Sequence, residues 1–169
     1  TDYYGVNSDY GTLADFQTLL AEAHKRDIKI IIDLVLNHTS TQHPWFRQAL
    51  QGQSEYKDWY IWSDTNPGFA GPWGAPAWYQ ASNGQYYYAI FWDQMPDLNF
   101  DNPAVREEVN KITAFWLQDV GIDGFRLDAI RYLDEDGQIL ADAPTTHAYL
   151  KEWGAYYRGL NPQAFTVGE

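Results

Sequence analysis

The sequence GIDGFRLDAIRY, residues 121–132, contains an alternating run of apolar and charged side chains. Phe125 and Leu127 are apolar, whereas Arg126 and Asp128 are charged. Because successive side chains of a β-strand point to opposite faces, the alternation predicts a strand that carries Arg126 and Asp128 together on one face, near its carboxyl end. When this stretch is taken alone, a structural ion pair and a functional pair both fit it.

Helical patterns lie on both sides of this strand. One helix is predicted to begin with Pro103 at its first helical position and to stop near Gly121. Another is predicted over residues 145–158. A further helix near the start of the chain is predicted by apolar spacing and by Thr12 and Asp15, which are placed as a capping box.

Two more strands complete the pattern. Residues 28–36 form a nearly continuous aliphatic run, which is typical of a strand buried on both faces, and residues 164–169 form the last strand. The alternation of strands and helices predicts an α/β fold with a parallel sheet and right-handed crossovers. A closed (β/α)₈ barrel needs about 250 residues, so the sheet is either open or a segment of a larger barrel. The last residue, Glu169, ends a strand of the buried type, which favours a segment.

Residues 39–102 interrupt this alternation with prolines and aromatic residues. A short helix is expected over residues 43–51 and a strand over residues 85–92. An insert of about 60 residues is too long for a simple connection and predicts a subdomain. The predicted division of the chain is therefore 1–38, 39–102 and 103–169. Most tryptophans of the insert are expected in its core, although flat aromatic faces also line sugar sites. They are Trp45, Trp59, Trp62, Trp73, Trp78 and Trp92.

The composition excludes several classes of partner. The 169 residues carry a formal net charge of −12, which argues against nucleic acid and anionic membrane surfaces because phosphate binding needs a basic patch. A run of about 18 apolar residues, as a membrane span requires, does not occur. Cysteine is absent, which excludes disulfides and thiolate metal sites. A signal peptide is not visible, and the compartment stays open, with an extracellular location favoured over a cytoplasmic one.

Polar residues gather at the ends of the three predicted strands. In parallel α/β folds, ligands bind at the carboxyl ends of the strands. Two carboxylates, one held ionised by a neighbouring cation and one free to be protonated, match the division of labour in glycoside hydrolysis with retention. The residues are Asp33, Asn37, His38, Arg126, Asp128 and Glu169.

Four motifs resemble those of the α-amylase family of glycoside hydrolases, which are (β/α)₈-barrel enzymes that act on α-glucosidic bonds. Residues 33–38 (DLVLNH), 124–129 (GFRLDA) and 167–169 (VGE) resemble the motifs at the third, fourth and fifth barrel strands. Residues 95–99 (MPDLN) resemble a marker near the end of the subdomain that follows the third strand. The resemblance covers the whole chain and implies a segment of a TIM (β/α)₈ barrel, about strands three to five, with an inserted aromatic-rich subdomain.

The resemblance also implies roles for individual residues. Asp128 falls on the family's catalytic nucleophile, and Glu169 falls on its general acid/base. Arg126 matches the arginine that holds the nucleophile ionised, and His38 matches a histidine that binds the sugar at the cleavage subsite. Taken alone, His38 fits a structural histidine at a strand end, but its neighbours favour the sugar-binding role.

The chain departs from the family pattern at Arg131-Tyr132, where many α-amylases carry Lys-His. In the family, these positions contact the part of the substrate that leaves after cleavage. Arg131 is therefore expected to bind substrate there, and which reducing-end sugar the enzyme prefers stays open. A second essential aspartate of the family lies beyond the motifs of this chain. The 169-residue segment alone is therefore expected to be inactive.

A structural calcium ion is a weaker expectation, and the chemistry itself requires no metal or other cofactor. Asn37 matches a position that binds calcium in many members, and its usual partner corresponds to Asn99. Calcium prefers charged oxygen ligands, so a neutral residue at 99 argues against the site. Both asparagines are expected to be structural.

The expected function is hydrolysis of internal α-1,4-glucosidic bonds in starch-like glucans or maltooligosaccharides, as part of a larger chain. The motif at residues 95–99 resembles an intermediate branch of the family that includes maltogenic and liquefying α-amylases, whereas residues 37–46 resemble the α-glucosidase and oligo-1,6-glucosidase branch. An exo-acting α-glucosidase or a transglycosylase is therefore the first alternative. A catalytically silent binding module or transporter subunit is the second, and the presence of both Asp128 and Glu169 argues against it.

Overall fold

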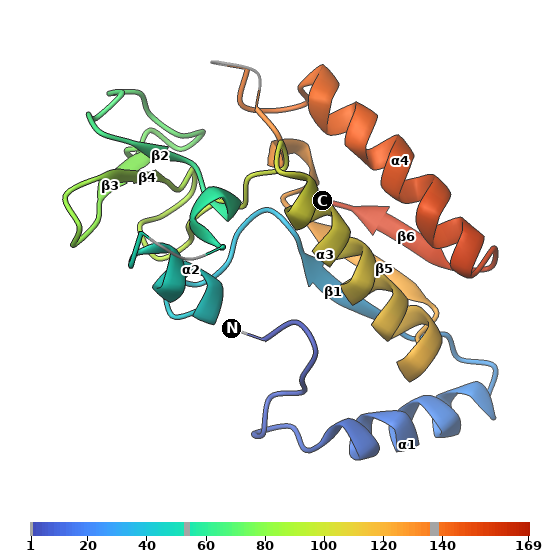
Figure 1. The fold of residues 1–169 in the computed structure, drawn as a ribbon. Coiled ribbons are helices and arrows are strands. Elements are labelled where there is room, and N and C mark those ends of the chain that lie inside the picture. The colour runs from blue at the N-terminus through green and yellow to red at the C-terminus, as the bar shows by residue number, and fades with distance from the viewer. Residues whose placement is uncertain (1, 53–54, 136–138) are drawn as a thin grey trace.

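The computed structural model describes residues 2–52, 55–135 and 139–169 (Figure 1). Its larger sheet has three parallel strands in the order β1 (Ile31–Val35), β5 (Gly124–Asp128) and β6 (Phe165–Gly168). Helices connect the strands, as the alternation of patterns predicts. The predicted parallel α/β arrangement is therefore confirmed.

Local sequence signals set the ends of the helices. α1 (Leu13–His24) begins at the capping box of Thr12 and Asp15, in which both reciprocal hydrogen bonds are present. The helix predicted after Asn102 is α3 (Pro103–Ala114), and it continues as the π-helix η2 (Phe115–Val120). Gly121 ends it in the left-handed conformation (φ +90°), which favours glycine. α4 (Pro144–Leu160) is slightly longer than the helix predicted over residues 145–158.

One face of the sheet packs against α3 and α4, which lie side by side in Figure 1. Phe125 and Leu127 of the central strand are buried there, and the Phe125 ring contacts that of Trp153 on α4. Within this segment the outer strands are not buried on both faces as predicted, since Ile31 and Val167 are exposed. β1 and β6 are the edges of this sheet, and within the described residues the helices cover only one of its faces.

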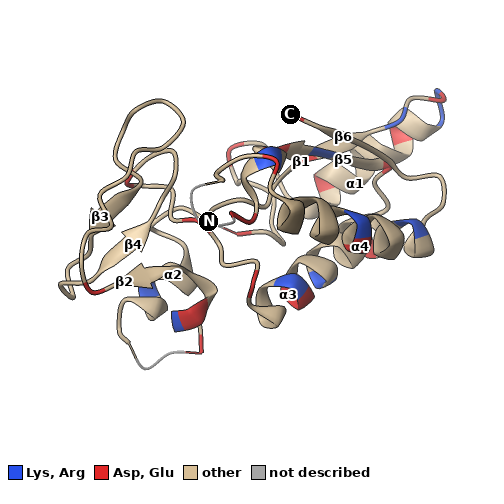
Figure 2. Ribbon diagram, turned by 90° about the horizontal axis from the view of Figure 1, so that it is seen from above, with Lys and Arg blue, Asp and Glu red and all other residues tan. Residues whose placement is uncertain are grey.

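The insert forms a second, antiparallel sheet in the order β2 (Trp62–Ser63), β4 (Tyr86–Tyr88) and β3 (Trp78–Gln80). The expected short helix is α2 (Pro44–Ala49), and the one-turn η1 (Lys57–Trp59) follows it. Figure 1 shows this unit beside the larger sheet, and in Figure 2 its strands carry no charged residue. The division of the chain at residues 38 and 102 stays a prediction.

Aromatic packing holds the insert together. Phe46 of α2 stacks on Trp62 and makes edge contacts with Tyr60 and Tyr87. The expected strand over residues 85–92 is shorter than predicted, because after β4 the backbone turns away to bond with other loops.

Four of the six tryptophans of the insert pack into its clusters, as most were expected to do, and the other two are exposed. The packed four are Trp45, Trp59, Trp62 and Trp78, and the exposed two are Trp73 and Trp92. Each helix in the described ranges is too short or too polar to cross a bilayer.

Candidate active site

The carboxyl ends of the three parallel strands meet at one edge of the larger sheet. Val35 pairs with Asp128, and Leu127 pairs with Gly168, so the strands end side by side. The backbone N–H of Glu169 donates to the carbonyl of Leu127 at 3.0 Å, which extends the pairing by one residue. Asp128 and Glu169 therefore lie on neighbouring strand ends, and both line one cavity of about 630 Å³.

The chain turns sharply directly after Asp128. Ala129 adopts a left-handed conformation (φ +51°), and the one-turn helix η3 (Ile130–Tyr132) follows. A non-glycine residue in this region is uncommon and costs free energy, so the turn is held by its surroundings. One such contact is the hydrogen bond from the N–H of Ile130 to the carbonyl of Glu169 at 3.2 Å. The turn after one acidic residue is thus bonded to the backbone of the other.

Arg126 links the acidic residues of the site. Its Nη1 lies 2.7 Å from Oδ2 of Asp33 and 2.9 Å from Oδ1 of Asp128, and its Nη2 pairs with Oε2 of Glu169. Hydrogen bonding to Asp33, together with the nearby charges, raises the pKa of Arg126 above its ordinary value. As the alternation predicts, Arg126 and Asp128 lie together on one face of the strand.

Glu169 is the second strand-end acid beside this guanidinium. One cation thus lies beside the acidic residues at both strand ends. The Glu169 side chain is 69% exposed in this segment and lines the cavity. That its carboxyl group is free to be protonated, as the sequence pattern suggests, stays a prediction.

His38 lines the same cavity, and its hydrogen bonds fix which ring nitrogen carries the proton. The Asn37 amide faces the carbonyl of Tyr132, which can only accept, so its nitrogen points there and its Oδ1 faces Nδ1 of His38 at 3.0 Å. Nδ1 therefore donates, and Nε2 keeps a lone pair that can accept a hydroxyl proton. Burial lowers the pKa of His38, and the charge of Asp128 opposes this only in part, so the neutral imidazole is favoured.

Arg131 lies at the rim of this cavity. Its guanidinium makes a forked contact with Asp142, with Nε 3.1 Å from Oδ1 and 2.9 Å from Oδ2. This hydrogen bonding raises the pKa of Arg131. The contact with Asp142 orients the guanidinium and uses some of its N–H donors. Arg131 therefore lies at the cavity with fewer N–H groups left to bind a ligand than the sequence alone suggests.

Aromatic side chains from the insert complete the wall of the cavity. They belong to the loop segments around residues 73 and 91–95, and η3 contributes a further ring. A mostly apolar wall with a few convergent polar groups is the usual form of a small-molecule site. The apolar lining consists of Trp73, Phe91, Trp92, Met95, Ala129 and Tyr132.

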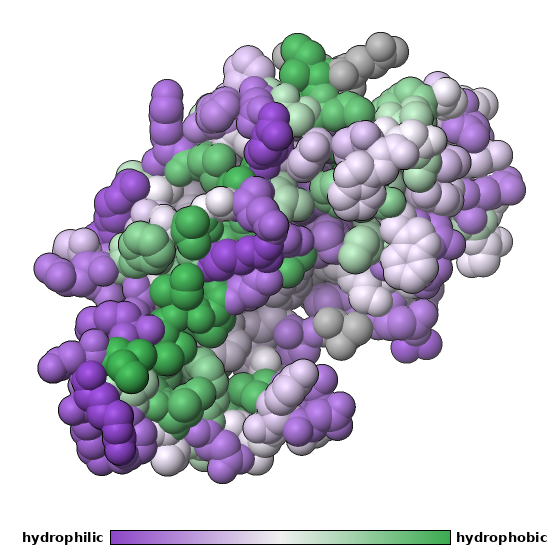
Figure 3. Space-filling view, turned by 180° about the vertical axis from the view of Figure 1, so that it is seen from behind, coloured by the Kyte–Doolittle hydropathy of each residue, from purple (hydrophilic) through white to green (hydrophobic). Residues whose placement is uncertain are grey.

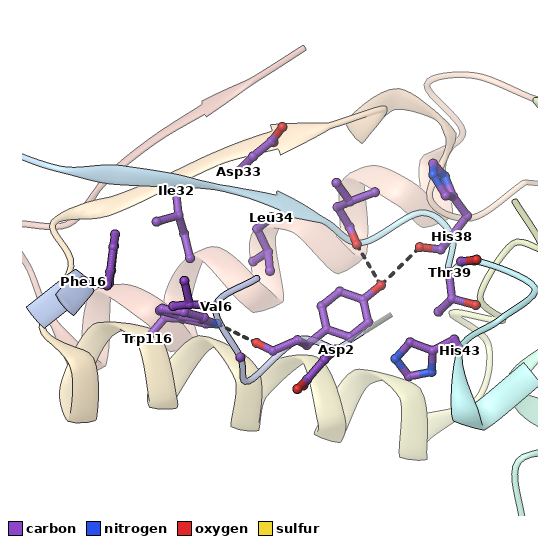
Figure 4. A pocket seen from close by; sticks show the side chains of 14 residues that line it. Asp2, Val6, Phe16, Ile32, Asp33, Leu34, His38, Thr39, His43 and Trp116 are labelled. Atoms are coloured by element: carbon purple, nitrogen blue, oxygen red, sulfur yellow. Dashed lines mark hydrogen bonds between the residues drawn. The ribbon is translucent and has the colours of Figure 1, made fainter. Parts of the chain in front are cut away.

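A second cavity, of about 460 Å³, lies along β1 (Figure 4). The hydroxyl of Tyr3 is within hydrogen-bond distance of the carbonyls of Val35 (2.9 Å) and His38 (3.1 Å) there. In Figure 4, Ile32 and Leu34 point to one side of β1, whereas the Asp33 and His38 side chains point to the other. Because Asp128 and Glu169 both line the larger cavity, that cavity is the candidate active site.

The surroundings of Asn37 do not fit a calcium ion as they are arranged. The residue that faces it is the buried Asp97, not Asn99, whose amide donates to the carbonyl of Asp58. The Asn37 amide nitrogen donates to both Asp97 Oδ2 and the Tyr132 carbonyl. Its N–H groups thus occupy the space between the oxygens that a cation would need. Within the described ranges, His, Cys, Asp and Glu form no group of three that could hold a metal.

A family model described as the alpha amylase catalytic domain matches residues 1–169. The chain belongs to the α-amylase family of glycoside hydrolases. Its fold is accordingly a segment of the family's (β/α)₈ barrel, as the resemblance implied.

Individual relatives in the family carry different activities in their names. Alpha-amylase 3 of Dictyoglomus thermophilum is 47% identical over 100% of this chain and 32% of its own length. Trehalose-6-phosphate hydrolase of Escherichia coli is 42% identical over 99% of this chain and 33% of its own length. The crystal structure of Bacillus licheniformis trehalose-6-phosphate hydrolase superposes with a TM-score of 0.89 at 41% identity, over 99% of this chain and 33% of that one. The chain therefore spans about a third of the length of these relatives.

The structure adds contacts to the site that the sequence pattern did not predict. Asp33 was noted at a strand end, but its contact with Arg126 makes it part of the charged network. Asp33 lies opposite Arg126 because of the register between β1 and β5, and this register is known only from the structure of the sheet. The exposed Trp73 and Trp92 were grouped with core tryptophans, and the signal that separates them is the glycine- and proline-rich sequence around the first and the turn that follows the second.

Proposed function

We propose that the complete protein hydrolyses internal α-1,4-glucosidic bonds in starch-like glucans and retains the anomeric configuration. The observation that carries this proposal is the placement of Asp128 and Glu169 on adjacent strand ends, at one cavity and around one arginine. Retaining hydrolysis needs two carboxyl groups beside the glycosidic bond. The relative named alpha-amylase, at 47% identity, supports this substrate class.

In the first step, a carboxylate oxygen of Asp128 attacks the anomeric carbon. The bond from that carbon to the glycosidic oxygen breaks, and the leaving oxygen takes the proton that Glu169 carries. The product of this step is a glycosyl ester on Asp128. Glu169 is therefore assigned as the general acid of this step.

In the second step, water replaces the shortened glucan. The Glu169 carboxylate accepts a proton from the water, whose oxygen bonds to the anomeric carbon while the ester bond to Asp128 breaks. Two inversions at the same carbon restore the original α configuration. Arg126 then again contacts both carboxyl groups.

His38 and Arg126 orient the reacting groups. His38 lines the cavity with Nε2 available as an acceptor for a sugar hydroxyl, and Arg126 fixes the position of the Asp128 carboxyl group through its 2.9 Å contact. The bond and proton changes of both steps are assigned to Asp128, Glu169, water and the sugar, and none is assigned to a metal. An α-glucan or maltooligosaccharide is the proposed substrate.

The test uses the complete protein with Asp128→Asn and Glu169→Gln in separate variants. We expect each to lower kcat on a maltoheptaoside with a blocked non-reducing end by about 10³-fold or more, as expected for the loss of a nucleophile or a proton donor. Matched controls are Asp119→Asn and Glu107→Gln, which are exposed on the outer helices η2 and α3. Undiminished turnover in either test variant contradicts the catalytic assignment.

The same substrate separates the alternatives. Cleavage of the blocked maltoheptaoside, with an α-anomeric product in the first minutes of a proton NMR time course, supports internal attack with retention. Cleavage of the unblocked form only supports an exo-acting α-glucosidase, and release of a transferred product supports a transglycosylase. If the unaltered protein binds maltoheptaose but hydrolyses no α-glucoside, it is a silent binding relative.

A further inference from the structure

Trp73 is the tryptophan that this fold exposes most. Its side chain is 77% exposed, although it forms part of the wall of the cavity that holds Asp128 and Glu169. Trp92, on the same wall, is 56% exposed. Figure 3 shows rings, drawn pale because tryptophan and tyrosine have intermediate hydropathy, gathered at the end of the molecule that the insert occupies. Two large aromatic faces are thus open to solvent beside the acid pair.

The loop that carries Trp73 is a fixed turn. The N–H of Gly71 donates to the carbonyl of Ala75 at 2.8 Å, and the N–H of Gly74 donates to the carbonyl of Gly71 at 3.0 Å. A Cβ on Gly71 would lie 2.1 Å from the carbonyl oxygen of Ile90, so the loop packs directly against the backbone there. The tip of the loop therefore keeps a defined position relative to the buried Ile90 and to the residue after it.

That next residue, Phe91, connects Trp73 to the centre of the site. The ring centroids of Trp73 and Phe91 are 5.0 Å apart, and Phe91 makes an edge contact with Tyr132 at 5.2 Å. His38, the proposed sugar-hydroxyl acceptor, lies 6.1 Å from Phe91 in a further edge contact. A continuous row of rings thus runs from the floor of the cavity to the outermost indole. At its outer end, the described residues leave one large flat indole face uncovered.

We propose that Trp73 is a binding platform for a glucosyl unit beyond the one that is attacked, and that it makes the site select glucan chains over single glucosides. The proposal rests on the proposed function and deepens it. The C–H faces of a glucose ring are apolar and flat, so they pack on an open indole, while the ring hydroxyls stay in water. Because the indole lies at the outer end of the row of rings, it contacts a unit away from the anomeric carbon under attack.

The test compares Trp73→Ala with Trp73→Phe in the complete protein, on p-nitrophenyl maltoheptaoside and on p-nitrophenyl α-glucoside. We expect the alanine variant to lose kcat/KM on the long substrate at least tenfold more than on the single glucoside, mainly through KM. Phenylalanine should restore part of this loss because it keeps a flat ring. The control is Tyr10→Ala, an 84% exposed aromatic residue that does not line the cavity.

Equal losses on both substrates, or no loss on either, overturn the proposal. If the unaltered protein hydrolyses neither substrate, the proposed function fails by itself. In that case calorimetric titration of maltoheptaose into the unaltered protein and into Trp73→Ala decides the matter, since a platform predicts at least tenfold weaker binding in the variant. Unchanged affinity there overturns the proposal, and the thermal unfolding midpoints show whether each variant is folded.

Discussion

Nη1 of Arg126 lies 2.9 Å from Oδ1 of Asp128, two residues further along the same face of β5. The same guanidinium contacts Asp33 and Glu169, so one cation bridges three acidic side chains. We expect Arg126→Gln to lower kcat by about 100-fold or more, the loss typical of removing a donor that stabilises charge in the transition state. Steady-state kinetics of the complete protein on a maltooligosaccharide measures this loss.

Arg126→Lys separates charge from geometry. Lysine keeps the positive charge but cannot bind separate carboxylates from two nitrogens, so we expect activity between that of the glutamine variant and the unaltered protein. Arg158→Gln, an exposed change on α4, is the matched control and should leave kcat unchanged. A glutamine variant at position 126 with more than a tenth of the original kcat would show that the ion pair is only structural.

The neutral state of His38 leads to a second prediction. Because Nδ1 donates to Asn37, the ring offers Nε2 as an acceptor, and burial lowers its pKa. We expect His38→Ala to reduce kcat/KM by about 10- to 100-fold, which corresponds to roughly 1–3 kcal/mol for a lost buried hydrogen bond. We also expect kcat/KM of the unaltered protein to stay flat as pH falls through 6.5, since the imidazole gains its proton only at lower pH. A loss of activity centred near pH 6.5 that disappears in the alanine variant would contradict this.

Gly124 opens the central strand where β5 and β6 are closest. A Cβ there would lie 1.7 Å from the carbonyl oxygen of Phe165, and both strands would have to move apart to admit it. We expect Gly124→Ala to lower the free energy of unfolding by at least about 2 kcal/mol. Gly121→Ala is the matched control: its φ of +90° disfavours alanine, but nothing lies within 4 Å of the added methyl group, so the expected cost is about 1 kcal/mol. Urea denaturation of both variants measures the difference, and equal costs would count against the close approach.

Much of this arrangement could be predicted because its signals are local. Residues 125–128 alternate between the two faces of β5, as the two-residue period of a strand predicts. The start of α1 is set by a capping box that spans only four residues. The burial of the outer strands could not be predicted in the same way. A run such as residues 28–36 is apolar on both faces whether or not its neighbours are present. In this segment of the barrel, β1 has a single strand neighbour, so only part of its surface is covered.

Contacts between distant segments were also beyond the sequence pattern. Asp97, and not Asn99, faces Asn37 because a backbone bridge pairs the residue after Asn37 with Asp97. Arg126 binds Glu169 as well as Asp128, because the register of β5 and β6 brings the glutamate back beside the arginine. Such contacts depend on register and on side-chain reach across strands, which a single sequence does not specify.

His43 gives the stability of the fold a pH dependence. It is buried, its Nδ1 accepts the N–H of Trp45 at 3.2 Å as the cap of α2, and burial lowers its pKa to about 4. In the unfolded chain a histidine has a pKa near 6.5. Between pH 4 and 6.5, the unfolded state therefore binds a proton at this histidine and the folded state does not. Stability should therefore be intact above pH 6.5 and should fall as pH drops toward 4, by up to about 3 kcal/mol.

His43→Asn isolates this effect, because asparagine is a good cap acceptor that does not titrate. Burial raises the pKa of Glu135 to about 7, and this opposes the trend, since a carboxyl group with a raised pKa loses stability as pH rises. The useful quantity is therefore the difference in unfolding free energy between the unaltered protein and the variant, from urea denaturation at pH 4, 5.5 and 7, in which the contribution of Glu135 cancels. We expect this difference to move in favour of the asparagine variant as pH falls, because only the unaltered protein then has to release a proton from a buried ring in order to fold. A difference that stays constant across the three pH values would mean that the imidazole is protonated as readily in the fold as in the unfolded chain.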